Sequence, residues 1–107
     1  EDDAEEGARR EAMEEVGVRL GPLEAVGSFW SMPGISTERM HLFLGAFSKA
    51  DRVADAGGLA HEHENITVLE VPLAELPAWV ADGRIADMKT VLLVHALRLA
   101  HPGLCGP

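Results

Sequence analysis

The most informative stretch of this chain is Arg10-Glu11-Ala12-Met13-Glu14-Glu15-Val16-Gly17-Val18. On a helix, residues three and four apart share a face, so Glu11 lies beside both Glu14 and Glu15. Like charges at this spacing destabilise an isolated helix by about 0.2–0.5 kcal/mol per pair. A hard divalent cation would compensate, because Mg²⁺ prefers oxygen ligands and often takes one or two carboxylates together with waters and substrate phosphates. Arg10 lies four residues before Glu14 and is placed to form an ion pair with it.

The same residues are compatible with a solvated, Glu-rich surface helix, and carboxylate count alone favours that interpretation. The order of the residues favours a specific site. Arg-Glu, an apolar residue, Glu-Glu, Gly and a final apolar residue match all seven defined positions in the second half of the Nudix box. The chain therefore resembles the Nudix hydrolases. Gly17 stands where a left-handed C-cap glycine would end the helix.

The first half of the Nudix box is incomplete in this chain. The family pattern has a Glu eight positions before the Arg, and Asp2 occupies that position. The pattern also has a Gly six residues before that Glu, which would precede Glu1. The chain has no initiator Met. We therefore expect residues 1–107 to be the C-terminal part of a single Nudix hydrolase domain, with the N-terminal strands missing from this chain.

Composition limits the classes of function that remain. A length of 107 residues allows at most one domain, and 47% hydrophobic residues are ordinary for a globular chain. No segment approaches the roughly 20 apolar residues of a membrane span, and no signal peptide is visible. Cys105 is the only cysteine, which excludes an internal disulfide and a cysteine-based zinc site. A reducing, cytoplasmic location is therefore the default expectation.

The formal net charge of −9 argues against binding to nucleic acid, which normally requires a basic face. The same charge disfavours an anionic small substrate, unless metal ions lie between the carboxylates and the phosphates. The three glutamates of residues 10–18 meet that condition.

Capping and turn residues place the remaining elements. Asp2 and Asp3 are N-cap candidates for the first helix, Asp87 is one for the last, and Gly83 ends the middle helix. We expect helices over residues 3–16, 73–82 and 87–101, and strands over residues 23–30, 40–47 and 66–71. Apolar residues extend around much of the last helix, which predicts burial on more than one side.

A second group of candidate ligands is the run His61-Glu62-His63-Glu64, which precedes the third expected strand. In extended chain, alternate residues point the same way, so the two histidines share one side and the two glutamates the other. This leaves a His pair for zinc and a Glu pair for magnesium as alternatives. An acidic loop that faces solvent is the third interpretation and would be preferred for this group taken alone.

The segment from residue 29 to residue 101 resembles the Nudix branch that includes ADP-ribose pyrophosphatases and GDP-mannose pyrophosphatases. The runs that carry this resemblance are Ser31-Met32-Pro33-Gly34 with Thr37-Glu38, Gly57-Gly58 followed by Glu62-His63-Glu64-Asn65-Ile66, Gly83-Arg84-Ile85, and Asp87-Met88-Lys89-Thr90-Val91-Leu92-Leu93. Pro33 lies fifteen residues past the end of the box, where ADP-ribose pyrophosphatases tend to carry a proline. The double-glycine loop and the final helix are closer to the GDP-mannose branch.

The resemblance implies a metal centre. It assigns Glu11 and Glu15 as Mg²⁺ ligands, with Mn²⁺ as an alternative ion, and it brings Glu64 into the same metal cluster. Glu14 would support or share a metal, and Arg10 would hold Glu14 in place. We count Arg10 and Glu14 among the catalytic residues for this reason.

The resemblance also implies a general base and substrate contacts. Glu62 is the candidate general base. Glu38 matches a residue that contacts substrate, and Pro33 is assigned to the same region. Arg39 can reach a phosphate, although an ion pair with Glu38 or a neighbour explains it equally well. His63 replaces what is usually a carboxylate or amide between the two loop glutamates.

Other prominent side chains have structural interpretations. His41 and His95 lie in apolar surroundings, where core histidines are more common than ligands. Trp30 could stack on a base, but a tryptophan at a strand end is more often part of the core. Trp79 is expected in the core or at a dimer interface.

These observations predict an α/β (α+β) Nudix sandwich, with a mixed sheet between helices. The resemblance implies hydrolysis of the pyrophosphate bond of ADP-ribose, GDP-mannose or another nucleoside diphosphate sugar, by a homodimer. The alternatives are a non-catalytic Nudix-like domain that binds or senses a nucleotide, and a purely structural acidic domain. Retention of Glu11, Glu14 and Glu15 argues against the first alternative, and the loop glutamates argue against the second.

Overall fold

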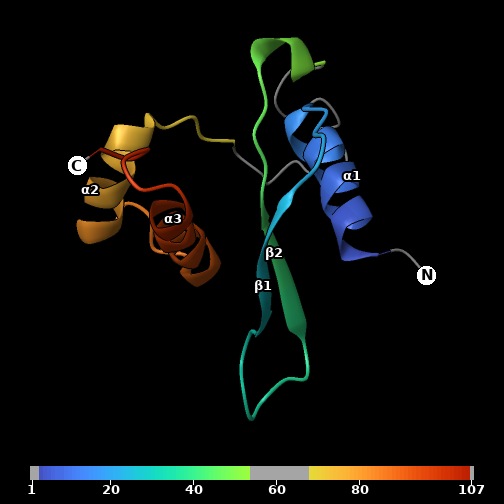
Figure 1. Cartoon of the computed structure of the whole chain (residues 1–107). Helices are drawn as coiled ribbons and strands as arrows, with labels where there is room; N and C mark the ends of the chain where they lie inside the picture. The colour runs from blue at the N-terminus through green and yellow to red at the C-terminus, as the bar shows by residue number, and fades with distance from the viewer. Residues whose placement is uncertain (1–2, 54–67, 107) are drawn as a thin grey trace. The chain divides into compact units, whose positions relative to one another are not determined.

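The computed structural model describes residues 3–53 and 68–106. The chain forms two compact units, Glu1–Leu69 and Glu70–Pro107, and each is described by itself. Helices occur in both units, and the antiparallel sheet of the described residues lies in the first (Figure 1). The α+β class predicted from the sequence is confirmed. No helix within the described ranges is both long and apolar enough to cross a membrane.

The first helix, α1 (Ala4–Val16), begins and ends at the predicted capping residues. The Asp3 carboxylate accepts a hydrogen bond from the backbone N–H of Glu6 at 2.7 Å, which satisfies one of the free donors of the first turn. Gly17 ends the helix with a φ of 79°, and its N–H donates to two carbonyl oxygens of the last turns. Only glycine adopts this left-handed conformation without steric cost.

The second and third elements are β1 (Glu24–Trp30) and β2 (Arg39–Leu44), which pair in antiparallel register. Trp30 lies opposite Arg39 at one end of the pair, and Glu24 lies opposite Leu44 at the other. A bulge interrupts the register between residues 25 and 27. The second strand was predicted to reach residue 47, but it ends at Leu44 because β1 offers no partner beyond Glu24.

Two backbone hydrogen bonds fix the end of α1 beside the chain that follows β2. Arg19 N–H donates to the Asp51 carbonyl at 2.8 Å, and Val53 N–H donates to the Gly17 carbonyl at 2.9 Å. Between them Val18 is only 2% exposed. Full burial of a valine side chain contributes about 1.5–3 kcal/mol, so this short bridge stabilises the position of α1.

A side-chain contact at the other end of α1 restrains the same helix. Glu5 accepts a hydrogen bond from the backbone N–H of Leu23, just before β1, and forms an ion pair with Arg9 at 2.8 Å. The helix is therefore held at both ends against the segments that flank the hairpin.

The predicted third strand is wrong for the part that the structure describes. Residues 68–71 form no strand, and the Leu69 side chain is 66% exposed. Residues 66 and 67 lie outside the described residues. Side-chain composition indicates that a segment fits a pleated surface, but a strand also requires a neighbour for its backbone groups. The described residues supply no such neighbour to this segment.

The second unit contains a short 3₁₀ turn, η2 (Leu73–Glu75), followed by α2 (Leu76–Ala81) and α3 (Met88–Ala100). Both predicted helices are confirmed. The Asp87 carboxylate caps α3 by accepting from the N–H and the hydroxyl of Thr90, and these bonds lower the pKa of Asp87. Pro77 stands in the first turn of α2, where a missing N–H costs little.

Arg84 braces the turn between α2 and α3. Its guanidinium donates to both carboxylate oxygens of Asp82 and lies 4.5 Å from the centre of the Trp79 ring. The hydrogen bonds from Arg84 hold the pKa of Asp82 below its ordinary value. Within this unit α3 buries Val94 but leaves Leu99 83% exposed, so the burial expected on several sides of α3 is not provided by the unit itself.

Two glycines of the first unit provide a matched test of its backbone. Gly17→Ala should lower the free energy of unfolding by about 1–2 kcal/mol, because alanine resists left-handed geometry. Gly7→Ala, inside α1, should raise it by about 0.5–1 kcal/mol, because alanine loses less backbone entropy in a helix. The nearest atom to the new methyl, Arg10 Nη2, lies at an ordinary 3.9 Å. Urea unfolding of both variants measures the two shifts, and equal shifts would contradict the capping role of Gly17.

Candidate functional site

Three carboxylates lie on the C-terminal half of α1, and we call Glu11, Glu14 and Glu15 the acidic arc. Glu11 is exposed, and Glu14 and Glu15 are half-buried. None of the three accepts a hydrogen bond or forms an ion pair within the described residues. The predicted Arg10–Glu14 ion pair does not occur among the described residues, and Arg10 takes part in another interaction.

The acidic arc has the donor chemistry that a hard divalent cation requires. Its carboxylate oxygens suit Mg²⁺ or Mn²⁺. None of these oxygens forms an ion pair with a basic side chain among the described residues. Across residues 3–53 and 68–106, however, no three acidic, histidine or cysteine side chains converge closely enough to hold a metal ion. The arc therefore fits a cation site that takes a further ligand from elsewhere, which is the role predicted for Glu64.

The loop that joins β1 to β2 forms a second candidate site. A pocket of about 290 Å³ lies there, lined by Trp30, Pro33, Gly34, Ser36 and Thr37. Pro33, predicted to contact substrate, lines this open pocket, and its contact with substrate stays a prediction. The carboxylate of Glu38, also predicted to contact substrate, accepts a hydrogen bond from the Ser31 hydroxyl at 2.8 Å. This bond closes the loop at its base.

Arg39 lies over the ring of Trp30, with its guanidinium carbon 4.5 Å from the ring centre. Its Nε donates to the Ser28 hydroxyl at 3.2 Å, and its Nη2 donates to the Ser28 carbonyl at 3.3 Å. The ion pair considered between Arg39 and Glu38 does not occur among the described residues. Arg39 thus presents a positive charge, held by stacking and by Ser28, beside the pocket.

Comparison with known proteins identifies the family. The model of the NUDIX domain matches residues 1–94 of this chain. The chain belongs to the Nudix family. The order Arg10-Glu11 and Glu14-Glu15-Val16-Gly17 is thus the family motif, and the acidic arc is its carboxylate face.

Similar Nudix proteins bear the name GDP-mannose pyrophosphatase. The protein from Cronobacter sakazakii is 41% identical over 99 residues, covering 92% of this chain and 51% of the relative. The protein from Pectobacterium atrosepticum is 42% identical over 94 residues, covering 87% and 48%. That from Escherichia coli O1:K1 is 36% identical over 100 residues, covering 94% and 51%. The predicted resemblance to this branch is confirmed, and the chain spans about half the length of these relatives.

Several expectations for individual side chains are corrected. His41 and His95 are exposed and do not belong to the core. Trp30 is 50% exposed and also lies outside the core. Trp79 is half-buried, and the Arg84 guanidinium lies over its ring.

The predicted loop ligands Glu62 and Glu64, with the neighbouring histidines His61 and His63, lie outside the described residues. Their approach to the acidic arc therefore stays a prediction. The sequence interpretation also missed Ser28, which holds Arg39. The contact between Ser28 and Arg39 could have been predicted by pairing the two strands across the loop of residues 31–38. Antiparallel pairing places residue 39 opposite residue 30 and close to residue 28.

Proposed function

We propose that this chain is the C-terminal part of a Nudix hydrolase that cleaves the pyrophosphate bond of a nucleoside diphosphate sugar. The products are a nucleoside monophosphate and a sugar phosphate, and the cofactor is Mg²⁺, which Mn²⁺ can replace. The observation that carries the proposal is the acidic arc, three carboxylates without a cationic partner among the described residues, in the order of the family motif. Similarity to proteins named GDP-mannose pyrophosphatase supports GDP-mannose over ADP-ribose.

The proposed roles follow from the chemistry of each side chain. Glu11, Glu15 and Glu64 hold the metal, and Glu14 supports it. When bound, the ion would supply charge neutralisation at the diphosphate and activation of a water. Glu62 would act as the general base toward the attacking water. Arg10 is proposed to position the helix carboxylates from its place one turn before Glu14, although the two form no ion pair among the described residues.

The hairpin loop is proposed to bind the remainder of the substrate. Pro33 lines the pocket, Glu38 accepts hydrogen bonds from hydroxyl groups, and Arg39 offers its remaining guanidinium donors to a phosphate oxygen. Because Arg39 is already fixed by Trp30 and Ser28, less side-chain entropy is lost when it binds an anion.

Net charge supports a metal-dependent mechanism. The chain carries 18 acidic and 9 basic residues, so a free diphosphate is repelled on average. A cation between the acidic arc and the diphosphate converts the local repulsion into attraction. The same charge supports the proposal that neither nucleic acid nor a membrane is a partner, and a cytoplasmic location is proposed with it.

The first test is hydrolysis by the full-length protein. Incubation with GDP-mannose and Mg²⁺ should release GMP and mannose 1-phosphate, ADP-ribose should be cleaved more slowly, and EDTA should abolish both reactions. Anion-exchange chromatography resolves the products. Binding of GDP-mannose without any release of nucleoside monophosphate would favour the non-catalytic sensor instead.

The second test separates the metal ligand from the base. Glu15→Gln should weaken Mg²⁺ binding about tenfold or more and lower kcat by orders of magnitude, because it removes a charged ligand. Glu62→Gln should lower kcat by about 10²–10⁴ while leaving Mg²⁺ affinity nearly unchanged. Glu6→Gln, at the opposite end of α1, is the control and should change neither. Calorimetry that finds Mg²⁺ weakened equally by Glu15→Gln and Glu62→Gln would refute this division.

The assembly proposed with this function is a homodimer. Ile35, at the tip of the hairpin loop, is 83% exposed, and Met32 beside it is half exposed. Apolar side chains gathered at an exposed loop mark an interaction surface. We place the loop of residues 32–38 near the active site of the second subunit.

Light scattering after size-exclusion chromatography tests this assembly. The full-length protein should have the mass of a dimer, and Ile35→Asp should shift it toward monomer, because a charge is desolvated at the interface. Leu99→Asp, equally exposed on α3, is the matched comparison. The 107-residue chain expressed alone should be inactive and unstable as a monomer. A cooperatively melting, active monomer of 107 residues would overturn the proposal.

A further inference from the structure

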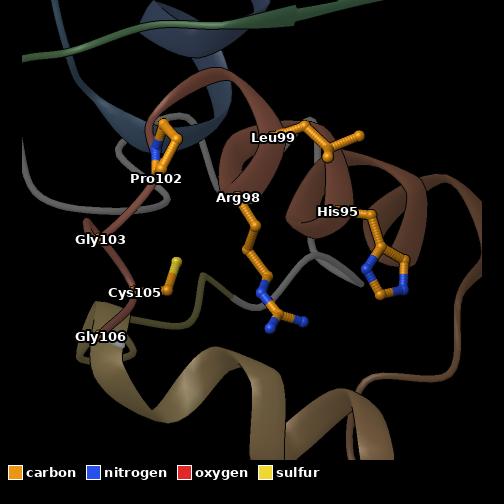
Figure 2. A pocket seen from close by; sticks show the side chains of 7 residues that line it. All are labelled: His95, Arg98, Leu99, Pro102, Gly103, Cys105 and Gly106. Atoms are coloured by element: carbon orange, nitrogen blue, oxygen red, sulfur yellow. The ribbon is translucent and has the colours of Figure 1, made fainter.

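The second unit contains a pocket that the proposed hydrolase function does not use. It has a volume of about 500 Å³ and lies between the C-terminal half of α3 and the tail that follows it, lined by His95, Arg98, Leu99, Pro102, Gly103, Cys105 and Gly106. Figure 2 shows the Arg98 side chain extending from α3 into the space between the His95 ring and the Cys105 thiol. The volume falls within the range of about 300–1,000 Å³ that is usual for small-molecule sites.

The wall opposite α3 is a folded tail held by backbone bonds. Leu104 N–H donates to the His101 carbonyl and Gly106 N–H donates to the Gly103 carbonyl, each at 3.1 Å. Gly103 and Gly106 have φ angles of 91° and 98°, which side-chain-bearing residues rarely adopt. These turns bring Cys105 back toward α3, where it is buried. The tail side of the pocket is thus formed by two hydrogen-bonded turns, each with a glycine at positive φ.

The charge of this pocket is opposite to that of the chain. Acidic residues outnumber basic ones by 18 to 9, yet within residues 3–53 and 68–106 no carboxylate lines the pocket, and Arg98 and His95 both do. Neither side chain forms an ion pair or hydrogen bond within the described residues. Arg84 pairs with Asp82 and Arg9 with Glu5, whereas Arg98 has no such partner among the described residues. Arg98 therefore has its donors available to a ligand.

The lining also indicates the kind of anion. An arginine fork matches phosphate oxygens with two parallel hydrogen bonds. The end of α3 carries a partial negative charge equivalent to about half an electron, which opposes an anion but is smaller than the full charge of Arg98. Leu99 and Pro102 add apolar surface beside Arg98, and the volume exceeds what a bare phosphate ion fills. A phosphate attached to a small organic group satisfies all three features.

We propose that the pocket between α3 and the C-terminal tail binds a small phosphomonoester, with Arg98 as its main anion ligand and His95 as a second donor. The apolar wall of Leu99 and Pro102 contacts the organic group. This site is independent of the acidic arc and does not rest on the proposed hydrolysis.

Calorimetric titration of the metal-free, full-length protein tests the proposal, with inorganic phosphate and a hexose 1-phosphate as separate probes. Both should bind, because they share the anion, and the hexose 1-phosphate should bind several-fold more tightly. Equal affinities would identify free phosphate as the ligand and overturn the phosphomonoester assignment. EDTA in the buffer prevents either probe from binding through a metal at the acidic arc.

Arg98→Gln should weaken both probes about tenfold or more, because a hydrogen bond to a charged group contributes about 1.5–3 kcal/mol. Arg98→Lys keeps the charge but loses the fork and should give an intermediate loss. Arg19→Gln is the matched control: Arg19 is exposed, lies in the first unit and lines neither pocket, so the same loss of charge there should leave affinity unchanged. Equal weakening by Arg98→Gln and Arg19→Gln would show a general charge effect and refute the site.

Cys105 supplies a second readout at the pocket wall. Peptide mapping after limited treatment with iodoacetamide measures its alkylation rate. Saturating hexose 1-phosphate should slow alkylation several-fold in the unmodified protein and leave it unchanged in Arg98→Gln. Thermal melting of each variant shows that it is folded under the assay conditions. Alkylation that is unaffected by the probe in the unmodified protein would place any binding outside this pocket.

Discussion

The acidic arc depends on the short bridge between Gly17–Arg19 and Asp51–Val53. Three neighbouring carboxylates on one helix repel one another by roughly 0.2–0.5 kcal/mol per pair, and a 13-residue helix is marginal on its own. The buried Val18, the two backbone bonds that flank it and the Gly17 cap together outweigh this repulsion. The family motif therefore combines two functions. Its charged positions form the candidate cation site, and its Gly and final apolar residue hold that site in place.

Local signals predicted the helices accurately because their causes lie within a few residues. Asp3 and Asp87 each accept a hydrogen bond three residues ahead, and Gly17 stands just after the last helical residue. The strands required more than local information. The β1 and β2 pairing was predictable from two apolar runs around a turn-rich loop, but the extent of β2 depends on where β1 begins. Residues 68–71 have the same composition signal without a partner, and there the prediction is wrong.

The parts of the candidate site that depend on the order of residues in the sequence were predictable. The parts that depend on the orientation of individual side chains were not. The order of Glu11, Glu14 and Glu15 was sufficient to place the acidic arc on one helix face. Arg10, in contrast, forms no ion pair with Glu14 among the described residues, because a sequence spacing of four residues does not determine which rotamer a long side chain adopts. His41 and His95 were expected in the core because their neighbours are apolar. Alternation along a strand and rotation around a helix leave both side chains exposed instead.

Net charge is an incomplete guide to what such a chain binds, because recognition depends on the groups within a few ångströms of the ligand. A charge of −9 predicts repulsion of phosphates in general. Two local groups of side chains differ from this average behaviour, each in its own way. The acidic arc concentrates negative charge until a divalent cation becomes the favourable partner, and the cation in turn attracts a diphosphate. The pocket between α3 and the tail has no carboxylate among its described lining residues and leaves Arg98 unpaired among the described residues, so we expect it to attract a phosphate without metal. Chelation of the metal distinguishes the two arrangements, because it removes the first attraction and leaves the second intact.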